Sequence, residues 1–488
     1  MQNLRKINKS IQGTKFCDLS ETKGMVKMKI TIIGGGPGGY EAAIMAAKLG
    51  AEVTVVEKNK VGGTCLNVGC IPTKALLASA EVLTTSLEAE KFGVFNDKTV
   101  VDPAQIIERK DKLVSGLVKG IEFLFESNGV NLIQGVGKLI DSKTVEVKRH
   151  DGGSEKLVSD KILLATGSVP ICPEMFHYDG VKVITSTEAL SLKTPPKSMI
   201  VIGGGVIGCE LGQFFSRMGT QITIVEMAEQ ILSNEDESVA KQLLRQFKRE
   251  KIKVLTATRV TDVNVQNTGI TVNLSSGKTL EVEMVLLSIG RASFSKELNL
   301  DALGISTNSK GQIEVDELLE TNVKGIYAVG DLINTPYLAH VASKEGTIAA
   351  ENMLGKNKTA VHKAIPRCVY TDPQVAAVGL TEKEAQQRGI AYKTGSFDFR
   401  SLGKAQIIGK IQGQVKIIVD EKDVIIGASI VGPEATDLLA ELTMAVHLGL
   451  TAEALGDVIH PHPTLSEAIM EALHDVHEMS INKVELRL

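Results

Sequence analysis

The sequence predicts an α/β fold in which one βαβ unit occurs twice, followed by an α+β domain at the C-terminal end. An apolar strand, a glycine-rich turn and a helix follow one another at residues 28–49, and again at residues 199–218. Residues 363–488 contain no third copy and instead show a hairpin and two amphipathic helices. With 488 residues, the chain is long enough for three or four domains.

The two halves of the chain match element by element. Each has a strand, a helix and a second strand, then a hairpin and a strand that ends in glycine. The first half also carries an additional helical segment around residues 67–90. The predicted ranges are 28–33, 40–49, 52–56, 144–158 and 162–167 in the first half, and 199–202, 210–218, 221–225, 270–282 and 285–290 in the second.

Both turns carry glycines in the pattern G-x-G-x-x-G. Alone this pattern is a weak signal, because glycines also serve plain turns and helix packing. Here each pattern follows an apolar strand, opens a helix whose N-terminus can hold a pyrophosphate, and precedes by about 20 positions an acid suited to a ribose hydroxyl. We therefore predict two Rossmann-like dinucleotide-binding domains. Their residues are Gly34, Gly36, Gly39 and Glu57 in the first, and Gly203, Gly205, Gly208 and Glu226 in the second.

The acid of the second site indicates which nucleotide binds there. Glu226 would repel the 2′-phosphate that distinguishes NADP from NAD. We therefore expect the second site to prefer NAD.

Two cysteines, Cys65 and Cys70, lie in a glycine-rich stretch inside the additional segment. They could be inert buried thiols. However, Cys70 begins a predicted helix, whose dipole favours a thiolate. The chain also has no secretory signal and few cysteines, so a reducing compartment is expected, where a close pair is more often catalytic than structural. Cys17, Cys172, Cys209 and Cys368 have no neighbouring cysteine in the sequence, and we expect no redox role for them.

His462 lies between two prolines and is followed by Glu467. Thr464 and Glu467 could form a capping box for the next helix, which alone would explain the glutamate. Thiol–disulfide chemistry also needs a group that exchanges protons near neutral pH, and imidazole is the usual one. Both interpretations remain open at this point.

Taken together, these residues resemble the class I pyridine nucleotide-disulfide reductases, which are flavoproteins with two redox cysteines. The most specific motifs are Gly-Gly-Thr-Cys-x4-Cys-Ile-Pro-x-Lys at residues 62–74 and His-Pro-Thr-x-x-Glu at residues 462–467. The resemblance implies FAD at the first site, NAD at the second, a redox-active Cys65–Cys70 disulfide, and a homodimer whose catalytic base is His462 supported by Glu467. It also implies that FAD is lined by Glu57, Lys74, Gly137, Thr166, Gly167, Gly330, Asp331, Ala339 and His340, that Glu210 pairs with Lys74, and that Gly290 belongs to the NAD site.

Within that family, the chain is similar to the members that oxidise protein-bound dihydrolipoamide with NAD+. Glutathione-specific members have arginines where this chain has Ile44 and Met45, and other members have further redox residues near the C-terminus. The implied partner is therefore a lipoyl domain of a 2-oxoacid dehydrogenase complex or of the glycine cleavage system. Two alternatives remain: an NADH-dependent reductase of another small disulfide, and a redox-silent flavoprotein scaffold.

One segment departs from the family pattern. After Gly290 and Arg291 the family usually continues with Arg-Pro-Asn, whereas this chain has Ala292-Ser293-Phe294. We expect the loop and the nicotinamide site near it to differ in detail.

The resemblance also implies the domain boundaries. A dimerisation domain is expected at the C-terminal end, and the FAD-binding domain is expected in two parts. The expected segments are an N-terminal extension at 1–27, the FAD-binding domain at 28–169 and 292–362, the NAD-binding domain at 170–291, and the dimerisation domain at 363–488.

Composition excludes several classes of function. A net charge of −4 argues against a nucleic-acid partner, and apolar runs of strand length argue against a membrane span. No metal site is expected. We expect residues 1–27 to be a disordered tail, the result of an upstream start codon, or a weak organellar presequence. We expect the protein to be located in the cytoplasm, or in the mitochondrial matrix if the source is eukaryotic.

Overall fold

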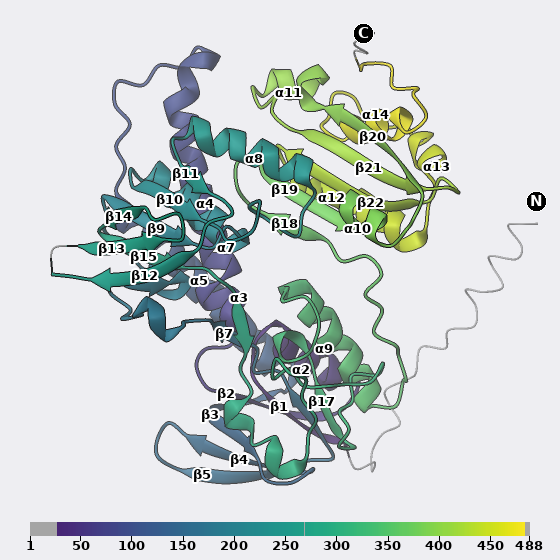
Figure 1. Cartoon of the computed structure of the whole chain (residues 1–488). Helices are drawn as coiled ribbons and strands as arrows, with labels where there is room; N and C mark the ends of the chain where they lie inside the picture. Colours follow the sequence, from purple (N-terminus) through teal and green to yellow (C-terminus); the bar gives the residue numbers. More distant parts are fainter. Residues whose placement is uncertain (1–26, 268, 484–488) are drawn as a thin grey trace, which may run out of the picture.

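The computed structural model describes residues 27–267 and 269–483, so the expected N-terminal extension lies outside it except for residue 27. Three bodies make up the molecule (Figure 1). Two contain mainly parallel sheets, and the third, at the C-terminal end, contains an antiparallel sheet. The predicted class, α/β with two related halves and a C-terminal α+β domain, is confirmed.

The first body is built on a seven-stranded sheet with the order β17-β6-β1-β2-β3-β4-β5. Its first five strands are parallel, and β4 and β5 form the predicted hairpin. Strands β1 and β6 are almost wholly buried, as expected for a parallel sheet covered on both faces. The strands are β1 (Lys29–Ile33), β2 (Glu52–Glu57), β3 (Asn131–Leu139), β4 (Thr144–Arg149), β5 (Ser154–Val158), β6 (Lys161–Leu164) and β17 (Ile326–Ala328).

The second body repeats this plan with a five-stranded sheet of order β11-β10-β9-β15-β8 and a three-stranded sheet of order β12-β13-β14. Strand β9 lies between β10 and β15 as β1 lies between β2 and β6. The predicted internal repeat is therefore present. The strands are β8 (Val183–Thr185), β9 (Ser198–Ile202), β10 (Gln221–Val225), β11 (Lys253–Leu255), β12 (Val260–Val265), β13 (Ile270–Leu274), β14 (Thr279–Val282) and β15 (Met284–Leu287), with helices α6 (Ser186–Ala189), α7 (Val206–Arg217) and α8 (Glu237–Arg249).

The additional segment of the first half consists of α3 (Gly63–Val68), α4 (Cys70–Glu88) and a helix that the motifs do not indicate, α5 (Pro103–Asn128). Helix α5 has clear end signals. The Asp102 side chain accepts bonds from the backbone of Ala104 and Gln105, Pro103 is the first helical residue, and Gly129 ends the helix with φ of 67°.

The stretch Gly63–Phe92 would be long and apolar enough to cross a membrane, judged by length and composition alone. The sequence-based prediction considered only unbroken apolar runs. It did not detect this helical stretch, because polar residues interrupt it. The stretch bends at Gly69, and Lys74 forms an ion pair with the buried Glu210. Helix α4 also packs against α5 and α7. We therefore interpret the stretch as part of the folded first body.

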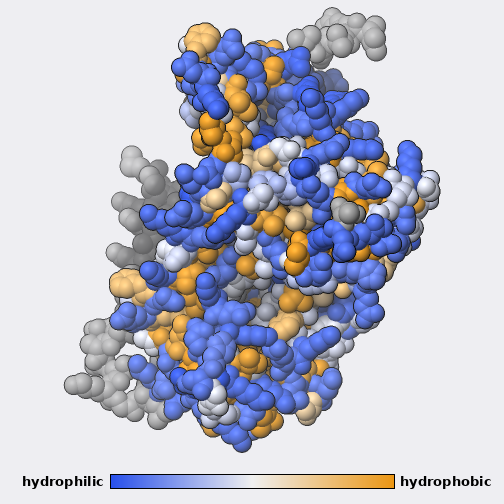
Figure 2. All heavy atoms as spheres, turned by 90° about the vertical axis from the view of Figure 1, so that its left-hand side faces the viewer, coloured by the Kyte–Doolittle hydropathy of each residue, from blue (hydrophilic) through white to orange (hydrophobic). Residues whose placement is uncertain are grey.

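The far end of α4 and the segment after it project from the molecule (Figure 1), and apolar atoms are visible on the projection (Figure 2). Large apolar side chains on this segment are more than half exposed. Those side chains are Val82, Leu87, Phe92, Val94, Phe95 and Val100.

The C-terminal body contains a five-stranded antiparallel sheet with the order β18-β19-β22-β21-β20. Helices α12 and α14 pack on its strands and share a core with them. The second predicted helix, residues 465–478, is shorter than expected. The elements are β18 (Arg367–Val369), β19 (Gln374–Gly379), β20 (Tyr392–Asp398), β21 (Gln414–Asp420), β22 (Ile425–Gly432), α10 (Glu382–Gln387), α11 (Gly403–Ile407), α12 (Ala435–Leu448), α13 (Ala452–Gly456) and α14 (Glu467–Asp475).

Two helices of the first body, α2 (Pro37–Lys48) and α9 (Ala339–Met353), cross at glycines. A Cβ atom on Gly346 would lie 2.1 Å from the carbonyl oxygen of Gly38, which belongs to the backbone and cannot rotate away. The close crossing therefore depends on glycine, and it fixes α9 against the glycine turn that begins α2.

We predict that Gly346→Ala destabilises the protein by about 1–3 kcal/mol, because the added methyl group overpacks a backbone contact. The matched control is Gly116→Ala in α5, where a Cβ atom has no neighbour within 4 Å. That change should be neutral or stabilise by up to about 1 kcal/mol. Urea denaturation of the full chain measures both, and equal midpoints for the two variants would contradict the argument.

Candidate active site

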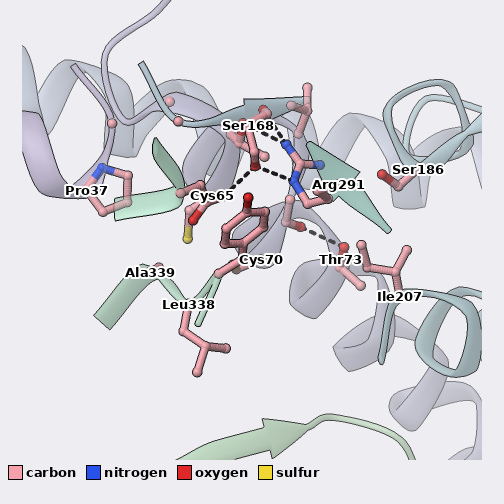
Figure 3. A pocket seen from close by; sticks show the side chains of 18 of the residues that line it. Pro37, Cys65, Cys70, Thr73, Ser168, Ser186, Ile207, Arg291, Leu338 and Ala339 are labelled. Atoms are coloured by element: carbon pink, nitrogen blue, oxygen red, sulfur yellow. Dashed lines mark hydrogen bonds between the residues drawn. The ribbon is translucent and has the colours of Figure 1, made fainter. Parts of the chain in front are cut away.

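A cleft of about 2530 Å³ runs between the three bodies. Its volume is more than twice that of an ordinary small-molecule pocket, about 300–1,000 Å³. Both glycine turns and both cysteines of the 62–74 stretch face it, some of them visible in Figure 3. The predicted residues that line it are Gly34, Gly36, Glu57, Cys65, Cys70, Lys74, Gly137, Thr166, Gly167, Gly203, Gly205, Glu210, Glu226, Gly290, Gly330, Asp331, Ala339 and His340.

The two glycine turns have the same hydrogen bonds. The Glu57 carboxylate accepts bonds from the backbone N–H groups of Gly35 at 2.6 Å and Asn59 at 2.7 Å. The Glu226 carboxylate accepts from Gly204 at 2.6 Å and Ala228 at 2.7 Å. Each acid is thereby held at the end of its strand, at the cleft wall.

The third glycine of each fingerprint does not line the cleft. A Cβ atom on Gly39 would lie 1.9 Å from the Gly34 carbonyl oxygen, and one on Gly208 would lie 2.0 Å from that of Gly203. The expectation that Gly39 and Gly208 bind a nucleotide stays a prediction, and the structure gives both glycines a packing role. They allow helix and strand to pack closely, so that the turn in front of them can approach a ligand.

The residues present fit two bound dinucleotides. Gly36 and Gly205 are the N-caps of helices α2 and α7, and no side chain caps either helix among the described residues, so N–H groups of each first turn are available to a ligand at the cleft. Asn67 also lines the cleft, and its buried Oδ1 atom has no partner among the described residues. A hydrogen-bond donor on a ligand would satisfy it.

The cysteines lie at the junction of α3 and α4, and both are free thiols. Cys70 is the first residue of α4, as predicted, and faces the cleft. A hydrogen bond from Cys65 is the largest effect on Cys70 and, with help from Lys74, lowers its pKa to about 7 although burial opposes the shift. The same hydrogen bond and burial raise the pKa of Cys65. The pair is therefore polarised, with the thiolate on Cys70.

One turn along α4, Lys74 forms an ion pair with Glu210 of α7 at 2.8 Å. Glu210 is only 3% exposed, so its charge depends on this partner. Burial acts to lower the pKa of Lys74, but Glu210 and Cys70 outweigh it, and the net shift is upward. Lys74 therefore stays positively charged beside Cys70.

A polar network that the motifs do not indicate lies close to the cysteines in the cleft (Figure 3). The Arg291 guanidinium donates to the Ser168 hydroxyl at 2.7 Å and to the Ser168 carbonyl at 2.6 Å, and Ser168 donates to Asp331. Arg291 also reaches the hydroxyl of Thr64 at 3.4 Å. Residues from separate parts of the chain are thus tied together. The family resemblance implied Asp331 as a cofactor-lining residue, but the sequence did not indicate its link to Ser168 and Arg291.

Residues 292–294, where the chain departs from the family pattern, form specific contacts with the first body. The Ser293 hydroxyl bonds to the Asp331 carbonyl at 2.6 Å and to the Tyr337 hydroxyl at 2.9 Å. The Phe294 carbonyl accepts from Thr166 at 2.5 Å, and the Phe294 ring lies 4.9 Å from the Lys58 ammonium. The loop is therefore anchored on the first body.

His462 and Glu467 do not lie in the cleft with the cysteines. The His462 side chain is 78% exposed, and its Nδ1 atom donates to the Glu467 carboxylate at 2.8 Å. Glu467 also accepts from the backbone of Thr464 at 2.9 Å, but the Thr464 hydroxyl bonds to Pro461 instead of the helix. The capping box is therefore only half formed, and the same glutamate orients the histidine.

Two nucleotide folds that share one cleft with a polarised pair of cysteines define an oxidoreductase of the dithiol–disulfide class. The chain belongs to the pyridine nucleotide-disulphide oxidoreductase family, whose model matches residues 28–346, with the family's dimerisation domain matching residues 365–473.

Individual relatives are similar over nearly the whole chain. The chain is 39% identical to a dihydrolipoyl dehydrogenase of Geobacillus stearothermophilus, covering 92% of this chain and 96% of that one. It is 41% identical to a mitochondrial dihydrolipoyl dehydrogenase of Dictyostelium discoideum, covering 93% and 95%. Among solved structures, LpdA of Mycobacterium tuberculosis superposes with a TM-score of 0.86 at 29% identity, covering 92% and 99%.

We predict that NAD+ is preferred over NADP+ by about 5- to 150-fold, because a close carboxylate repels a phosphate by about 1–3 kcal/mol. Steady-state kcat/KM with each nucleotide measures the ratio. Glu226→Gln should lower the ratio of kcat/KM with NAD+ to kcat/KM with NADP+. Glu229 is exposed and lies outside the cleft, so Glu229→Gln should leave this ratio unchanged. Equal kcat/KM values for the two nucleotides in the unaltered protein would refute the argument.

Proposed function

We propose that the protein is a dihydrolipoyl dehydrogenase. It oxidises dihydrolipoamide carried by a lipoyl domain to lipoamide and reduces NAD+ to NADH. The observation that carries the proposal is the polarised pair Cys65 and Cys70 between two nucleotide turns, with the charged Lys74 beside Cys70. The relatives with the name dihydrolipoyl dehydrogenase support the choice of substrate.

The cofactors have distinct places in this proposal. The first glycine turn, Glu57 and the residues around Asp331 would hold FAD, and the second glycine turn and Glu226 would hold NAD. Bound FAD supplies an acceptor for two electrons from the thiolate and a donor of hydride to NAD+. The chain itself binds and orients the reactants and manages the thiol protons.

The dithiol step balances through the cysteine disulfide. A substrate thiolate attacks Sγ of Cys65, a new S–S bond forms, the Cys65–Cys70 bond breaks, and Cys70 leaves as a thiolate. The second substrate thiol, once deprotonated, attacks the mixed disulfide, which releases lipoamide and leaves Cys65 reduced. The two electrons lost by the substrate are then on the cysteine pair, and Lys74 stabilises the negative charge on Cys70.

His462 accepts the thiol protons. Its Nδ1–H group donates to Glu467, so the other ring nitrogen, Nε2, is free as a base. Hydrogen bonds from His462 and Thr464 lower the pKa of Glu467 although burial opposes the shift. The carboxylate therefore stays ionised, and it stabilises the imidazolium that forms.

The exposed position of His462 supports a shared active site. Its own chain keeps it outside the cysteine cleft, and the body that carries it matches a dimerisation domain. Exposed apolar side chains on the same body include Met444, Leu448 and Ile459. We propose that the chain forms a homodimer in which the partner's His462 serves the Cys65–Cys70 pair.

Two further assignments follow from the proposed reaction. The lipoyl domain belongs to a 2-oxoacid dehydrogenase complex or to the glycine cleavage system. The protein acts in the cytoplasm, or in the mitochondrial matrix if the source is eukaryotic. The site residues and domain boundaries given from the sequence are part of the same proposal.

The test of the proposed activity is turnover of dihydrolipoamide with NAD+ by the FAD-loaded protein. NADH-dependent reduction of lipoamide and of other small disulfides tests the alternative reductase. A flavin spectrum that does not change with dithiol would favour the redox-silent scaffold. Slower turnover of dihydrolipoamide than of an unrelated disulfide would contradict the proposal.

The two cysteines should have unequal roles. Cys65→Ser keeps a thiolate at Cys70, so we expect a long-wavelength charge-transfer band of the flavin. The band should be present above the pKa of Cys70, about 7 in the unaltered dithiol, and be lost below it, because only the thiolate donates charge. Cys70→Ser should lack the band at every pH. The opposite pattern would mean that the roles are exchanged.

The shared site predicts complementation between inactive subunits. Cys65→Ser and His462→Gln proteins, mixed so that subunits exchange, form heterodimers with one intact Cys–His site. Activity should rise to about a quarter of the parental level if half the dimers are mixed, because each mixed dimer has one intact site out of two.

The matched control is a mixture of Cys65→Ser with Cys70→Ser, which leaves no chain with an intact pair and should stay inactive. If mass measurements show exchanged subunits while the first mixture stays inactive, the histidine acts within its own chain.

A further inference from the structure

A small polar cavity of about 150 Å³ lies behind Lys74, on the side away from the cleft. Gln213, Arg217 and Asp372 are among the residues that line it. Such a cavity has room and partners for several water molecules. Among the described residues, Lys74 and Tyr370 alone line both this cavity and the large cleft. These two side chains therefore form the partition between the two spaces.

The Tyr370 ring makes direct contact with the charge of Lys74. The Lys74 ammonium lies 4.6 Å from the centre of the ring, within the range of a cation–π interaction. The ammonium is also paired with Glu210 at 2.8 Å. The ring and the carboxylate together define where the positive charge lies.

The backbone around Tyr370 is held by one face of α7. Glu210 accepts the backbone N–H of Tyr370 at 2.8 Å. Gln213 exchanges two bonds with the backbone of Asp372, both at 2.8 Å, and Arg217 pairs with the Asp372 carboxylate at 2.9 Å. These three helix residues are spaced i, i+3 and i+7, so they lie on one face. The position of the ring is therefore set by a docked segment and not by a free side chain.

The charge of Lys74 acts on Cys70 one turn away. Lys74 lowers the pKa of Cys70, and Glu210 acts in the opposite direction. The other groups that face Cys70 are the Cys65 thiol, which lowers its pKa most, and the Arg291 guanidinium. Of these groups, Lys74 is the cation whose position depends on a residue of the C-terminal body.

We propose that Tyr370 is a positioning residue for the thiolate chemistry. Its ring holds the Lys74 ammonium toward Cys70 and closes the cleft against the polar cavity behind it. Loss of the ring opens that partition, lets water screen the ammonium and loosens its hold on the thiolate. This inference rests on the proposed function only in that Cys70 is the working thiolate.

The experiment measures the ionisation of Cys70 without substrate. Full-length, FAD-loaded protein with Cys65→Ser is titrated by the charge-transfer band and, in parallel, by the rate at which iodoacetamide alkylates Cys70, identified by peptide mass mapping. The added variants are Tyr370→Leu, which removes the ring, and Tyr370→Phe, which keeps the ring and removes the hydroxyl. Tyr370→Met is a second variant that fills space without a ring.

We expect Tyr370→Leu and Tyr370→Met to raise the pKa of Cys70 by about 0.5–1 unit, because the ammonium would no longer be held by the cation–π contact. Alkylation below both pKa values should then slow about 3- to 10-fold. Tyr370→Phe should leave the pKa of Cys70 equal to that of the parent protein, because the ring is kept. If the hydroxyl were the important group, this variant would shift the pKa as well. FAD content and the thermal unfolding midpoint of each variant show whether it is folded.

Three results would overturn the inference: an unchanged pKa in a folded ring-less variant, a lowered pKa there, or an equal shift in Tyr370→Phe. The titration needs neither dihydrolipoamide nor NAD+, so its outcome is separate from that of the turnover assay. If the protein fails to oxidise dihydrolipoamide but shows the expected pKa shifts, the proposed substrate is wrong and the proposed role of Tyr370 is supported.

Discussion

The ion pair between Lys74 and Glu210 is the interaction on which the arrangement of the site depends. It joins α4, which carries Cys70, to α7, which begins at the second glycine turn. Removal of one partner from a buried pair costs about 3–5 kcal/mol, because the other charge is left without compensation, although an intact pair adds little net stability. The main effect of this ion pair is therefore to position α4 relative to α7. It brings the reactive sulfur to the cleft wall between the two nucleotide turns.

The βαβ fold provides a nucleotide turn in both halves, and in the first half it also carries the segment with the two cysteines. Both halves hold an acid with two backbone N–H groups and pack a third glycine against the first, so they present equivalent turns to the cleft. The segment from α3 to α5 exists only in the first half. The additional segment thus leaves both turns alike, and the second half supplies Glu210. The equivalent residue of the first half, Glu41, accepts hydrogen bonds from Tyr40 and Ser343 and forms no ion pair among the described residues.

The sequence predicted those features that follow from local pattern. The repeat, the hairpins, the position of Cys70 at the start of a helix and the residues of the two glycine fingerprints could be recognised, because strand and helix periodicity and glycine spacing are short-range signals. The other predicted cleft residues, among them Lys74, Asp331 and His340, were implied by the resemblance to the family. Helix α5 was missed although Asp102, Pro103 and Gly129 mark its ends. The network of Arg291, Ser168 and Asp331 could not be found, because it joins residues far apart in the chain and needs the fold first.

The interpretation of Glu467 shows a different limit. Sequence reasoning weighed a helix cap against a catalytic role as alternatives, yet the carboxylate has two oxygens, and it bonds to the Thr464 backbone with one and to His462 with the other. The backbone bond fixes the carboxylate, and the carboxylate then fixes the ring. Because His462 is exposed on the body that matches a dimerisation domain, this orientation is complete before any second subunit arrives. In the proposed homodimer, association would therefore bring together two parts that are already ordered, the imidazole of one chain and the polarised cysteines of the other, which would lower the entropic cost of assembling the site.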